Sequence, residues 1–314
     1  MTTNDIAMHS TDDEGHIDPA VSDAIDALAN DRRLEILFAL ADREWEVQEN
    51  GHVMSFTDLY DAVDVDSTSQ FSYHLKHLVG RFVAEMDGGY QLTYAGDKIV
   101  RAVRSGLYEA TLTFEAVDVD GVCPFCREAA LVADSLEERF VVRCTACDSM
   151  LLADAFPRSQ AAHRSPSEIA ESFGCGIWST AVAVDGGVCP ECNGVVDASV
   201  DSHERVGLVV HTVDHTCREC RTMIHLPIEV FVALHPATAA FLHRHGISIL
   251  ETPLWELFGH FTSKNWTTDV RSASPLEARF ELSCGDETLV LEMGDDLEVT
   301  PVADTPEISP ESNK

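Results

Sequence analysis

Apolar and polar positions alternate with helical spacing in residues 67–81. Three apolar side chains recur at i, i+4 and i+7 and so share one face of a helix, namely Phe71, Leu75 and Leu78. The other face carries hydrogen-bonding side chains: Gln70, Tyr73, His74, Lys76 and His77. Ser67 and Ser69 stand where an N-cap would begin the helix. Alone, the pattern favours an ordinary surface helix over one that reads DNA bases.

The flanking segments change that preference. Residues 21–29, 32–41, 58–63 and 95–104 have helical periodicity, whereas residues 43–53 are polar and predict a loop. Residues 82–86 and 90–93, joined by Asp87-Gly88-Gly89, predict a β-hairpin with a glycine turn. The expected order is therefore four helices, a hairpin and a fifth helix.

This order resembles the ArsR-like winged helix-turn-helix regulators over residues 18–110. The resemblance is carried by Arg-Leu-Glu-Ile-Leu at 33–37, by S-x-x-S-x-H-L-K-x-L at 69–78, and by the wing tip at 87–89. It implies a DNA-binding domain that dimerises through its outer helices, so double-stranded DNA and a second copy are the expected partners. The DNA-contacting positions would be Ser67, Thr68, Ser69, Gln70, Ser72, Tyr73, His74, Lys76, His77, Arg81, Gly88 and Gly89.

The chain departs from that family pattern in two places. The glycine usually found just before the wing is displaced, because the chain reads Gly80-Arg81-Phe82-Val83. The sequence alone therefore does not determine the turn between helix and wing. No cysteine precedes Cys123, so the metal-sensing pair near the recognition helix is not implied.

Eight of the ten cysteines form four C-x-x-C pairs: Cys123, Cys126, Cys144, Cys147, Cys189, Cys192, Cys217 and Cys220. A C-x-x-C turn aims two thiolates at one point, and a second pair completes a tetrahedral site. The pairs predict two structural zinc ions in tandem units that resemble zinc ribbons, although the spacing also admits iron. Four thiolates leave no open coordination position, so we expect no metal catalysis. A thioredoxin-like redox site would need a single C-x-x-C pair after a strand and before a long helix. Four pairs do not fit that pattern.

The remaining segments carry weaker signals. Residues 139–142 and 206–210 predict strands, residues 165–173 a capped helix, and Cys175 and Cys284 buried thiols. Four histidines near the second ribbon could offer one replacement ligand, but solvated or strand-face positions are the default: His203, His211, His215 and His225. The four C-terminal histidines have no metal spacing and predict core or solvated positions: His235, His243, His245 and His260.

Helices over 228–246 and 252–258 precede four alternating segments at 267–272, 277–283, 288–292 and 298–302, which predict a small antiparallel sheet. The expected fold class is α+β multidomain. Its predicted parts are a disordered N-terminus (1–17), a winged helix (18–110), zinc ribbon 1 (119–156), a helical linker (157–180), zinc ribbon 2 (181–226), a C-terminal α+β unit (227–302) and a disordered tail (303–314).

The net charge of −33 argues at first sight against nucleic acid as a partner. A host with very high internal salt, as for haloarchaeal proteins, offers another explanation, because the Debye length at 1 M salt is only about 3 Å. Residues 67–104 hold five basic and three acidic residues, a mildly positive patch. No apolar run is long enough for a membrane span and no signal peptide is visible, so we expect a cytoplasmic protein.

These observations predict a DNA-binding transcriptional regulator with structural zinc ribbons and a C-terminal region for an unknown effector or for dimerisation. The alternative is an interaction module whose winged helix contacts protein and whose ribbons bind protein or RNA. An enzyme is not expected, because no catalytic motif occurs in the sequence.

Overall fold

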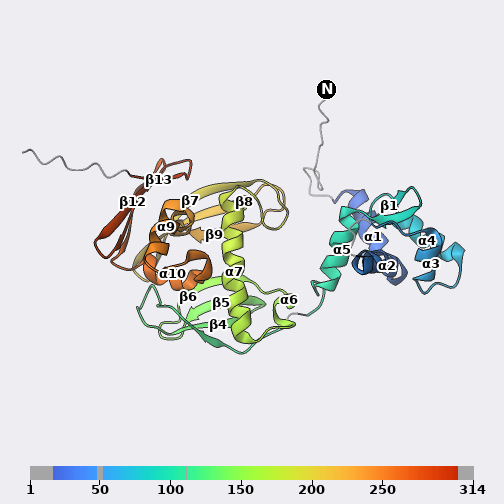
Figure 1. Ribbon diagram of the computed structural model, residues 1–314, viewed down its shortest axis with the longest axis horizontal. Coiled ribbons are helices and arrows are strands. Elements are labelled where there is room, and N and C mark those ends of the chain that lie inside the picture. Colours follow the sequence, from blue (N-terminus) through green and yellow to red (C-terminus); the bar gives the residue numbers. More distant parts are fainter. Residues whose placement is uncertain (1–16, 48–51, 111, 303–314) are drawn as a thin grey trace, which may run out of the picture. The chain divides into compact units, whose positions relative to one another are not determined.

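The computed structural model describes residues 17–47, 52–110 and 112–302. The chain divides into two compact units, Met1–Ala110 (unit 1) and Thr111–Lys314 (unit 2), each with its own hydrophobic core. Both combine helices with small antiparallel sheets, which confirms the mixed α+β class (Figure 1). The two ends predicted to be disordered lie outside the described residues, except for Ile17. None of the helices in the described part of the chain has the length and apolar character that crossing a bilayer demands.

Unit 1 has the predicted order of elements. They are α1 (Pro19–Leu28), α2 (Asp31–Val47), α3 (Phe56–Asp61), α4 (Thr68–Leu78), β1 (Val83–Met86), β2 (Gly89–Leu92) and α5 (Tyr94–Arg104). β1 and β2 pair as an antiparallel hairpin, and Met54 adds a single bridge to Tyr90 at its edge. The loop predicted from residue 43 is wrong up to Val47, because α2 continues there with an Arg43–Glu46 ion pair on its surface (3.1 Å).

The apolar stripe of α4 anchors this helix in the core of unit 1. Phe71, Leu75 and Leu78 are all buried. The Phe71 ring meets the rings of Phe56 and Tyr60 edge-on, with centroids 5.0 and 5.5 Å away. Such contacts add to the hydrophobic free energy of burial. The helix position is therefore fixed by its apolar side, which leaves its polar side outward.

The turn between α4 and β1 uses the displaced glycine. Gly80 has φ of +90°, a conformation that glycine adopts without steric cost, and its N–H donates to the carbonyl of Val83 at 2.8 Å. The displacement therefore still yields a closed turn into the hairpin.

Unit 2 contains three antiparallel sheets and five α-helices among its described residues. The first sheet is β3 (Val117–Val119), β4 (Leu131–Leu136), β5 (Arg139–Cys144) and β6 (Met150–Ala155). The second is β7 (Val196–Arg205), β8 (Leu208–Cys217) and β9 (Met223–Pro227). The third is β10 (Trp266–Ala273), β11 (Leu276–Cys284), β12 (Glu287–Met293) and β13 (Val299–Pro301). The helices are α6 (Arg158–Ala161), α7 (Pro166–Asp185), α8 (Ile228–Leu234), α9 (Pro236–Arg244) and α10 (Leu254–Phe261), with a 3-10 turn η1 (Ile249–Glu251).

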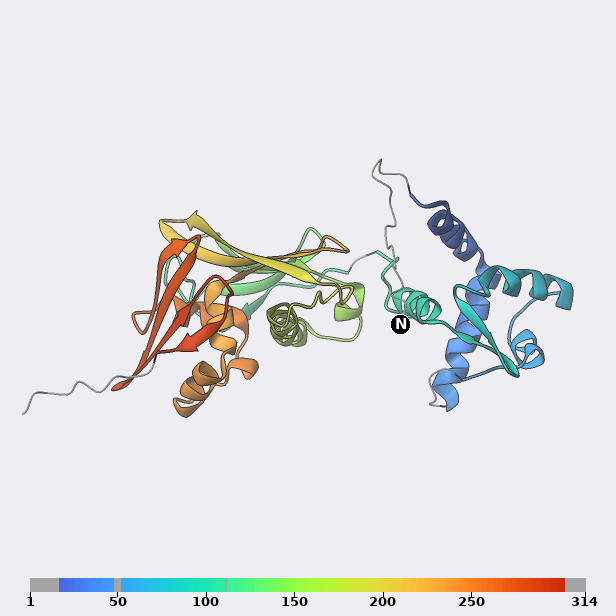
Figure 2. The same cartoon turned by 90° about the horizontal axis from the view of Figure 1, so that it is seen from above.

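One hydrophobic core joins all three sheets of unit 2. It extends from Cys123 to Met293, through α7, which lies across the first two sheets (Figures 1 and 2). The rings of Phe140 in β5 and Phe173 in α7 stack in parallel with centroids 4.0 Å apart. The segments predicted as zinc ribbon 1, helical linker, zinc ribbon 2 and C-terminal α+β unit pack together in one compact unit.

Two details of the second half differ from the sequence prediction. α7 runs to Asp185 and not to residue 173, so the expected boundary at 180/181 falls inside a helix. Within α7, a Cβ on Gly174 would lie 3.2 Å from the Pro253 Cβ, so glycine permits close packing there. The strand predicted over 206–210 is partly wrong: Val206 and Gly207 form the turn between β7 and β8.

Candidate metal centres and nucleic-acid interface

The four C-x-x-C pairs share one backbone conformation. In each, the N–H of the first cysteine donates to the carbonyl five residues later: Cys123 to Glu128 (3.0 Å), Cys144 to Ser149 (2.9 Å), Cys189 to Gly194 (2.9 Å) and Cys217 to Thr222 (2.9 Å). The residue after the second cysteine has a positive φ in all four: Arg127, Asp148, Asn193 and Arg221. This tight turn brings both thiols of a pair to the same side.

The pairs meet two by two across the ends of the strands. The closest sulfur contacts are Cys123–Cys147 at 3.7 Å, Cys126–Cys144 at 3.6 Å, Cys189–Cys220 at 3.6 Å and Cys192–Cys217 at 3.5 Å. All four sulfurs of each group lie within 4.8 Å of one another. A disulfide would need about 2.05 Å, whereas sulfurs around a tetrahedral zinc with bonds of about 2.3 Å are about 3.8 Å apart. Both groups can therefore hold a metal ion, as the spacing predicted.

Each group is half inside the core. Cys123, Cys144, Cys189 and Cys217 are fully buried. In the second group a Cβ on Gly194 would lie 3.2 Å from the sulfur of Cys192 and 3.3 Å from that of Cys217. Glycine at this position leaves room for the sulfurs to converge.

A hydroxyl supports the last cysteine of each group. Ser149 Oγ lies 3.3 Å from the sulfur of Cys147, and Thr222 Oγ1 lies 3.2 Å from that of Cys220. The side chain and then the backbone N–H of these residues lower the pKa of both thiols to about 6. Metals bind the thiolate, so both contacts favour the binding form.

No histidine takes the place of a cysteine ligand in either group of the described residues. His215 is buried on the inner side of β8, where burial lowers its pKa, and His203 and His225 lie on the outer side of the sheet. The C-terminal histidines join no metal-ligating group in the part that the structure describes. Cys175 was expected to be buried, but it is exposed on α7, because the buried face of that helix contains Phe173 and Ile177 instead.

The polar face of α4 is open to solvent in unit 1. Its exposed residues are Thr68, Ser69, Gln70, Ser72, Tyr73, Lys76 and His77. Ser67 caps the helix by accepting from the N–H of Gln70 (3.3 Å). The Tyr73 and His77 rings lie 4.4 Å apart, and the carbonyl of Tyr73 is 2.8 Å from His77 Nδ1. These side chains form one continuous surface.

Besides the cap Ser67, three of the predicted contact residues are held within unit 1, namely His74, Arg81 and Gly89, whereas Gly88 is not. His74 is half-buried, and burial followed by the nearby Arg33 charge lowers its pKa. Arg81 is exposed, but its guanidinium donates to the carbonyl of Ala20 in α1. Gly88 forms the exposed tip of the hairpin, whereas a Cβ on Gly89 would lie only 1.9 Å from the Met54 carbonyl oxygen.

The basic patch expected over 67–104 is partly neutralised. Arg101 pairs with Asp97 at 2.7 Å, and Arg104 pairs with Asp42 of α2. Lys76 and Lys98 form no ion pair with any residue that the structure describes. Asp97 was already counted in that window, whereas Asp42 comes from another helix, so the patch is weaker than its composition implied.

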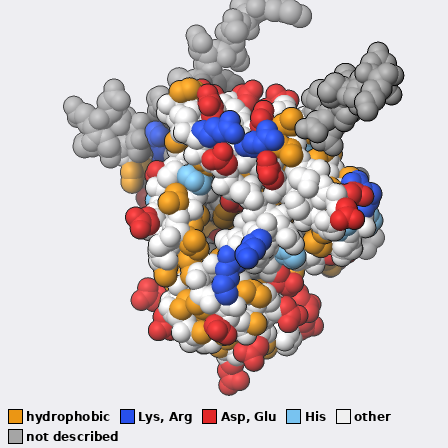
Figure 3. Space-filling view, turned by 90° about the vertical axis from the view of Figure 1, so that its left-hand side faces the viewer, with side chains coloured by type: hydrophobic (Ala, Val, Ile, Leu, Met, Phe, Trp, Pro, Cys, Tyr) orange, Lys and Arg blue, Asp and Glu red, His pale blue; other side chains and the backbone are white. Residues whose placement is uncertain are grey.

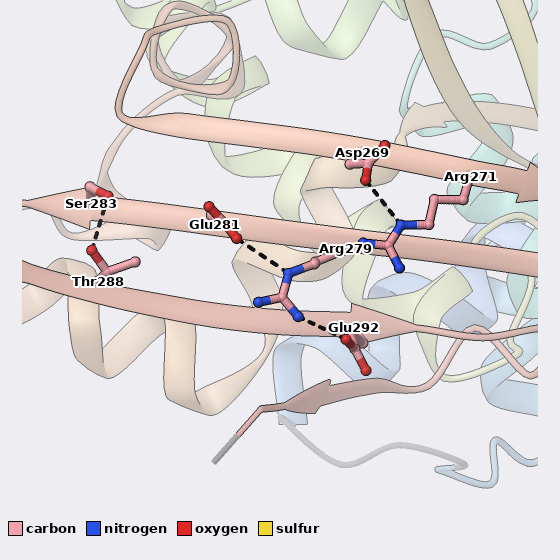
Figure 4. Close-up of polar contacts among 7 residues, drawn as sticks. All are labelled: Asp269, Arg271, Arg279, Glu281, Ser283, Thr288 and Glu292. Atoms are coloured by element: carbon pink, nitrogen blue, oxygen red, sulfur yellow. Dashed lines mark hydrogen bonds and ion pairs between the residues drawn. The ribbon is translucent and has the colours of Figure 1, made fainter. Parts of the chain in front are cut away.

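The outer face of the third sheet of unit 2 is a ladder of paired charges (Figure 4). Arg279 contacts Glu281 at 3.2 Å and Glu292 at 2.9 Å, and Arg271 contacts Asp269 at 3.1 Å. Acidic side chains are spread over the face drawn in Figure 3, with lysines and arginines in small groups among them. This sheet therefore offers solvated ion pairs.

Comparison with known proteins gives two family matches. The model described as Domain of unknown function (DUF7347) matches residues 21–103, and the one described as Domain of unknown function (DUF7351) matches residues 120–299. No curated protein and no solved structure matches the chain. Because the second match spans more than half of the 314 residues and most of unit 2, the chain belongs to the DUF7351 family.

Proposed function

We propose that the protein is a DNA-binding transcriptional regulator whose residues 18–110 act as a winged helix of the ArsR-like type. The observation that carries the proposal is the exposed face of α4, a row of hydrogen-bonding side chains on a helix anchored by Phe71, Leu75 and Leu78. The β1–β2 hairpin follows the helix directly, as a wing would.

In this proposal α4 enters the major groove, where an α-helix fits and where base edges carry a distinct pattern of donors and acceptors. Gln70 has the amide geometry for adenine, and Lys76 is a donor for guanine or phosphate. Tyr73 and His77 present a paired aromatic surface beside them. Gly88 at the hairpin tip allows the wing backbone to approach a phosphate.

We further propose that the two cysteine groups hold structural zinc as zinc-ribbon-like centres. The sulfur separations of 3.5–3.7 Å support a tetrahedral four-thiolate ion of this size. When bound, zinc would supply folding free energy and no chemistry. Metal analysis of the purified protein distinguishes zinc from iron.

The test begins with duplexes selected from a random pool by the wild-type protein. We expect Q70A/Y73A/K76A to lose binding to the selected duplexes in a gel shift, because these side chains read the groove. Lys98→Ala removes the same charge from α5 and serves as the matched control, which should retain binding. Unchanged binding by the triple variant, with its helical circular dichroism intact, would refute the proposed interface.

The salt dependence separates this reading from simple charge attraction. Non-specific binding to phosphates falls steeply as salt rises, whereas base contacts preserve discrimination among sequences. Wild-type protein should therefore still prefer the selected duplex over a scrambled one at the highest salt at which binding is measurable.

A second candidate is an interaction module that binds protein or RNA. The net charge of −33 and the pairing of Arg101 and Arg104 with carboxylates favour it. Affinity capture from the native host would then retain a stable protein or RNA partner while no duplex is selected from the random pool.

A further inference from the structure

The β7–β8 hairpin is longer than its counterpart in the first cysteine module. β7 and β8 have ten residues each, whereas β4 and β5 have six each. The register pairs Asp201 with Thr212 and His203 with Val210, so these four side chains lie on one face. Asp214 lies on the same face and pairs across to His225 in β9. The face therefore collects two carboxylates and two imidazoles.

We call Asp201, His203, Asp214 and His225 the hairpin cluster. One ligand atom from each of Asp201, His203 and Asp214 lies within 4.8 Å of the other two. His203 Nε2 is 3.8 Å from Asp201 Oδ2, and His225 Nδ1 is 2.9 Å from Asp214 Oδ1. Neighbouring ligand atoms of a zinc ion bonded at about 2.0–2.1 Å are about 3.3 Å apart. The separations in the hairpin cluster lie close to that value.

The charge of the hairpin cluster is not balanced by the protein. Neither Asp201 nor Asp214 pairs with a lysine or arginine in the described part of the chain, and Arg205 on the same face contacts neither. Burial is the largest single influence and raises the pKa of Asp214, but the contacts with His225 and Thr212 and the nearby His203 together lower the pKa by more, so the net pKa is lowered. Two carboxylates with no lysine or arginine beside them attract a cation.

We propose that the hairpin cluster binds one divalent transition-metal cation, with Asp201, His203 and Asp214 as ligands. His225 would hold the carboxylate of Asp214 in position or act as a further ligand beside it. A mixed set of imidazole nitrogen and carboxylate oxygen suits zinc, nickel or cobalt, whereas calcium and magnesium prefer oxygen alone. The side chains of Asp201, His203 and His225 are 61%, 48% and 54% exposed, so water keeps access to the ion. This site is open and exchangeable, unlike the four-thiolate centres.

The test uses tag-free, full-length protein whose cysteine centres are already filled, as checked by metal analysis. Titration with nickel or zinc chloride in a calorimeter should show one further cation per chain. Cobalt bound there should give the weak visible bands of nitrogen and oxygen ligands, without the thiolate-to-cobalt charge-transfer band that replacement in a cysteine centre produces.

Two variants and one control assign the site. Asp201→Asn and His203→Gln should each weaken the added cation by about tenfold or more. His211→Gln removes a histidine from the opposite face of the same hairpin, where it bonds to Ser202 at 2.8 Å, and should leave affinity unchanged. Retained metal in both cysteine centres shows that each variant is folded.

Three results would overturn the proposal. The first is the absence of a saturable cation beyond those in the cysteine centres. The second is an equal loss of affinity in His203→Gln and His211→Gln. The third is magnesium or calcium binding with the same affinity as nickel, which would indicate carboxylate attraction without imidazole ligands.

Discussion

Replacing Phe140 with alanine tests whether the two cysteine modules fold as one body. Phe140 is fully buried in β5, stacks on Phe173 of α7 at 4.0 Å with an interplanar angle of 3°, and lies 6.2 Å from the Trp255 ring of α10. It therefore joins the first module to two helices that pack against the rest of unit 2.

The expected cost follows from the size of the buried ring. Removing a buried phenylalanine side chain costs about 3–5 kcal/mol, which combines lost burial with the cavity left behind. For a unit of this size each kcal/mol shifts the melting temperature by about 2–4 °C, so F140A should melt about 6–20 °C lower. The fall should appear at both cysteine centres and in the third sheet, because strands of all three sheets contribute residues to one core.

The assay uses a W45F background. The three remaining tryptophans, Trp178, Trp255 and Trp266, all lie in the core of unit 2, so their emission reports that unit alone. Metal released during heating is followed with a chromogenic chelator. Leu136→Ala, in the neighbouring strand β4 but 45% exposed, is the control and should change stability by less than about 0.5 kcal/mol.

One result would refute the reasoning. If F140A releases one metal ion early while the tryptophan midpoint stays at the wild-type temperature, the first module is an independent domain. The shared core would then be a contact between separately folding parts.

Two other predictions follow from the same structure. Stripping metal with a chelator should unfold unit 2 as one body and leave unit 1 helical, because metal-binding free energy is folding free energy for such centres. The prediction is contradicted if the amide spectra of residues 17–110 lose their dispersion together with those of unit 2. Burial raises the pKa of Glu229, whose carboxylate accepts from the Thr268 hydroxyl at 2.8 Å. The folded state therefore favours the protonated acid. Its stability falls as the pH rises from about 4.3, the pKa in the unfolded chain, through the raised pKa of the folded state. Glu229→Gln should therefore melt higher than wild type at neutral pH and equally below about pH 4, whereas Glu277→Gln on the exposed side of β11 should show no such difference.

The local parts of this fold could be predicted from the sequence. The apolar stripe of α4, its Ser67 cap and the glycine turn of the hairpin each depend on residues a few positions apart, and they were confirmed. The C-x-x-C turns are equally local, so the grouping of their sulfurs followed from spacing alone.

Long-range packing explains what the sequence did not predict. α7 continues past its predicted end at Phe173, and its Trp178 donates to the Thr252 carbonyl at 2.9 Å, 74 residues away in the chain. His74 was placed on the polar face, but it is half-buried, and the charge of Arg33 in another helix lies near it. Periodicity records which face of an element is apolar, whereas it does not record which distant element covers that face.

The two kinds of cation site differ in how metal exchange would affect the protein. Each cysteine centre joins two turns at the ends of strands and has two fully buried ligands, so we expect its metal to exchange more slowly than a metal on the hairpin cluster. The hairpin cluster is exposed on an outer sheet face, and loading it orders side chains without moving a strand. A dilute chelator should therefore empty the hairpin cluster first, with tryptophan emission unchanged. If dilute chelator changes DNA binding while tryptophan emission stays constant, the change is a response to loss of the exchangeable ion. If DNA binding changes only when the tryptophan signal is lost, the change reports unfolding of unit 2.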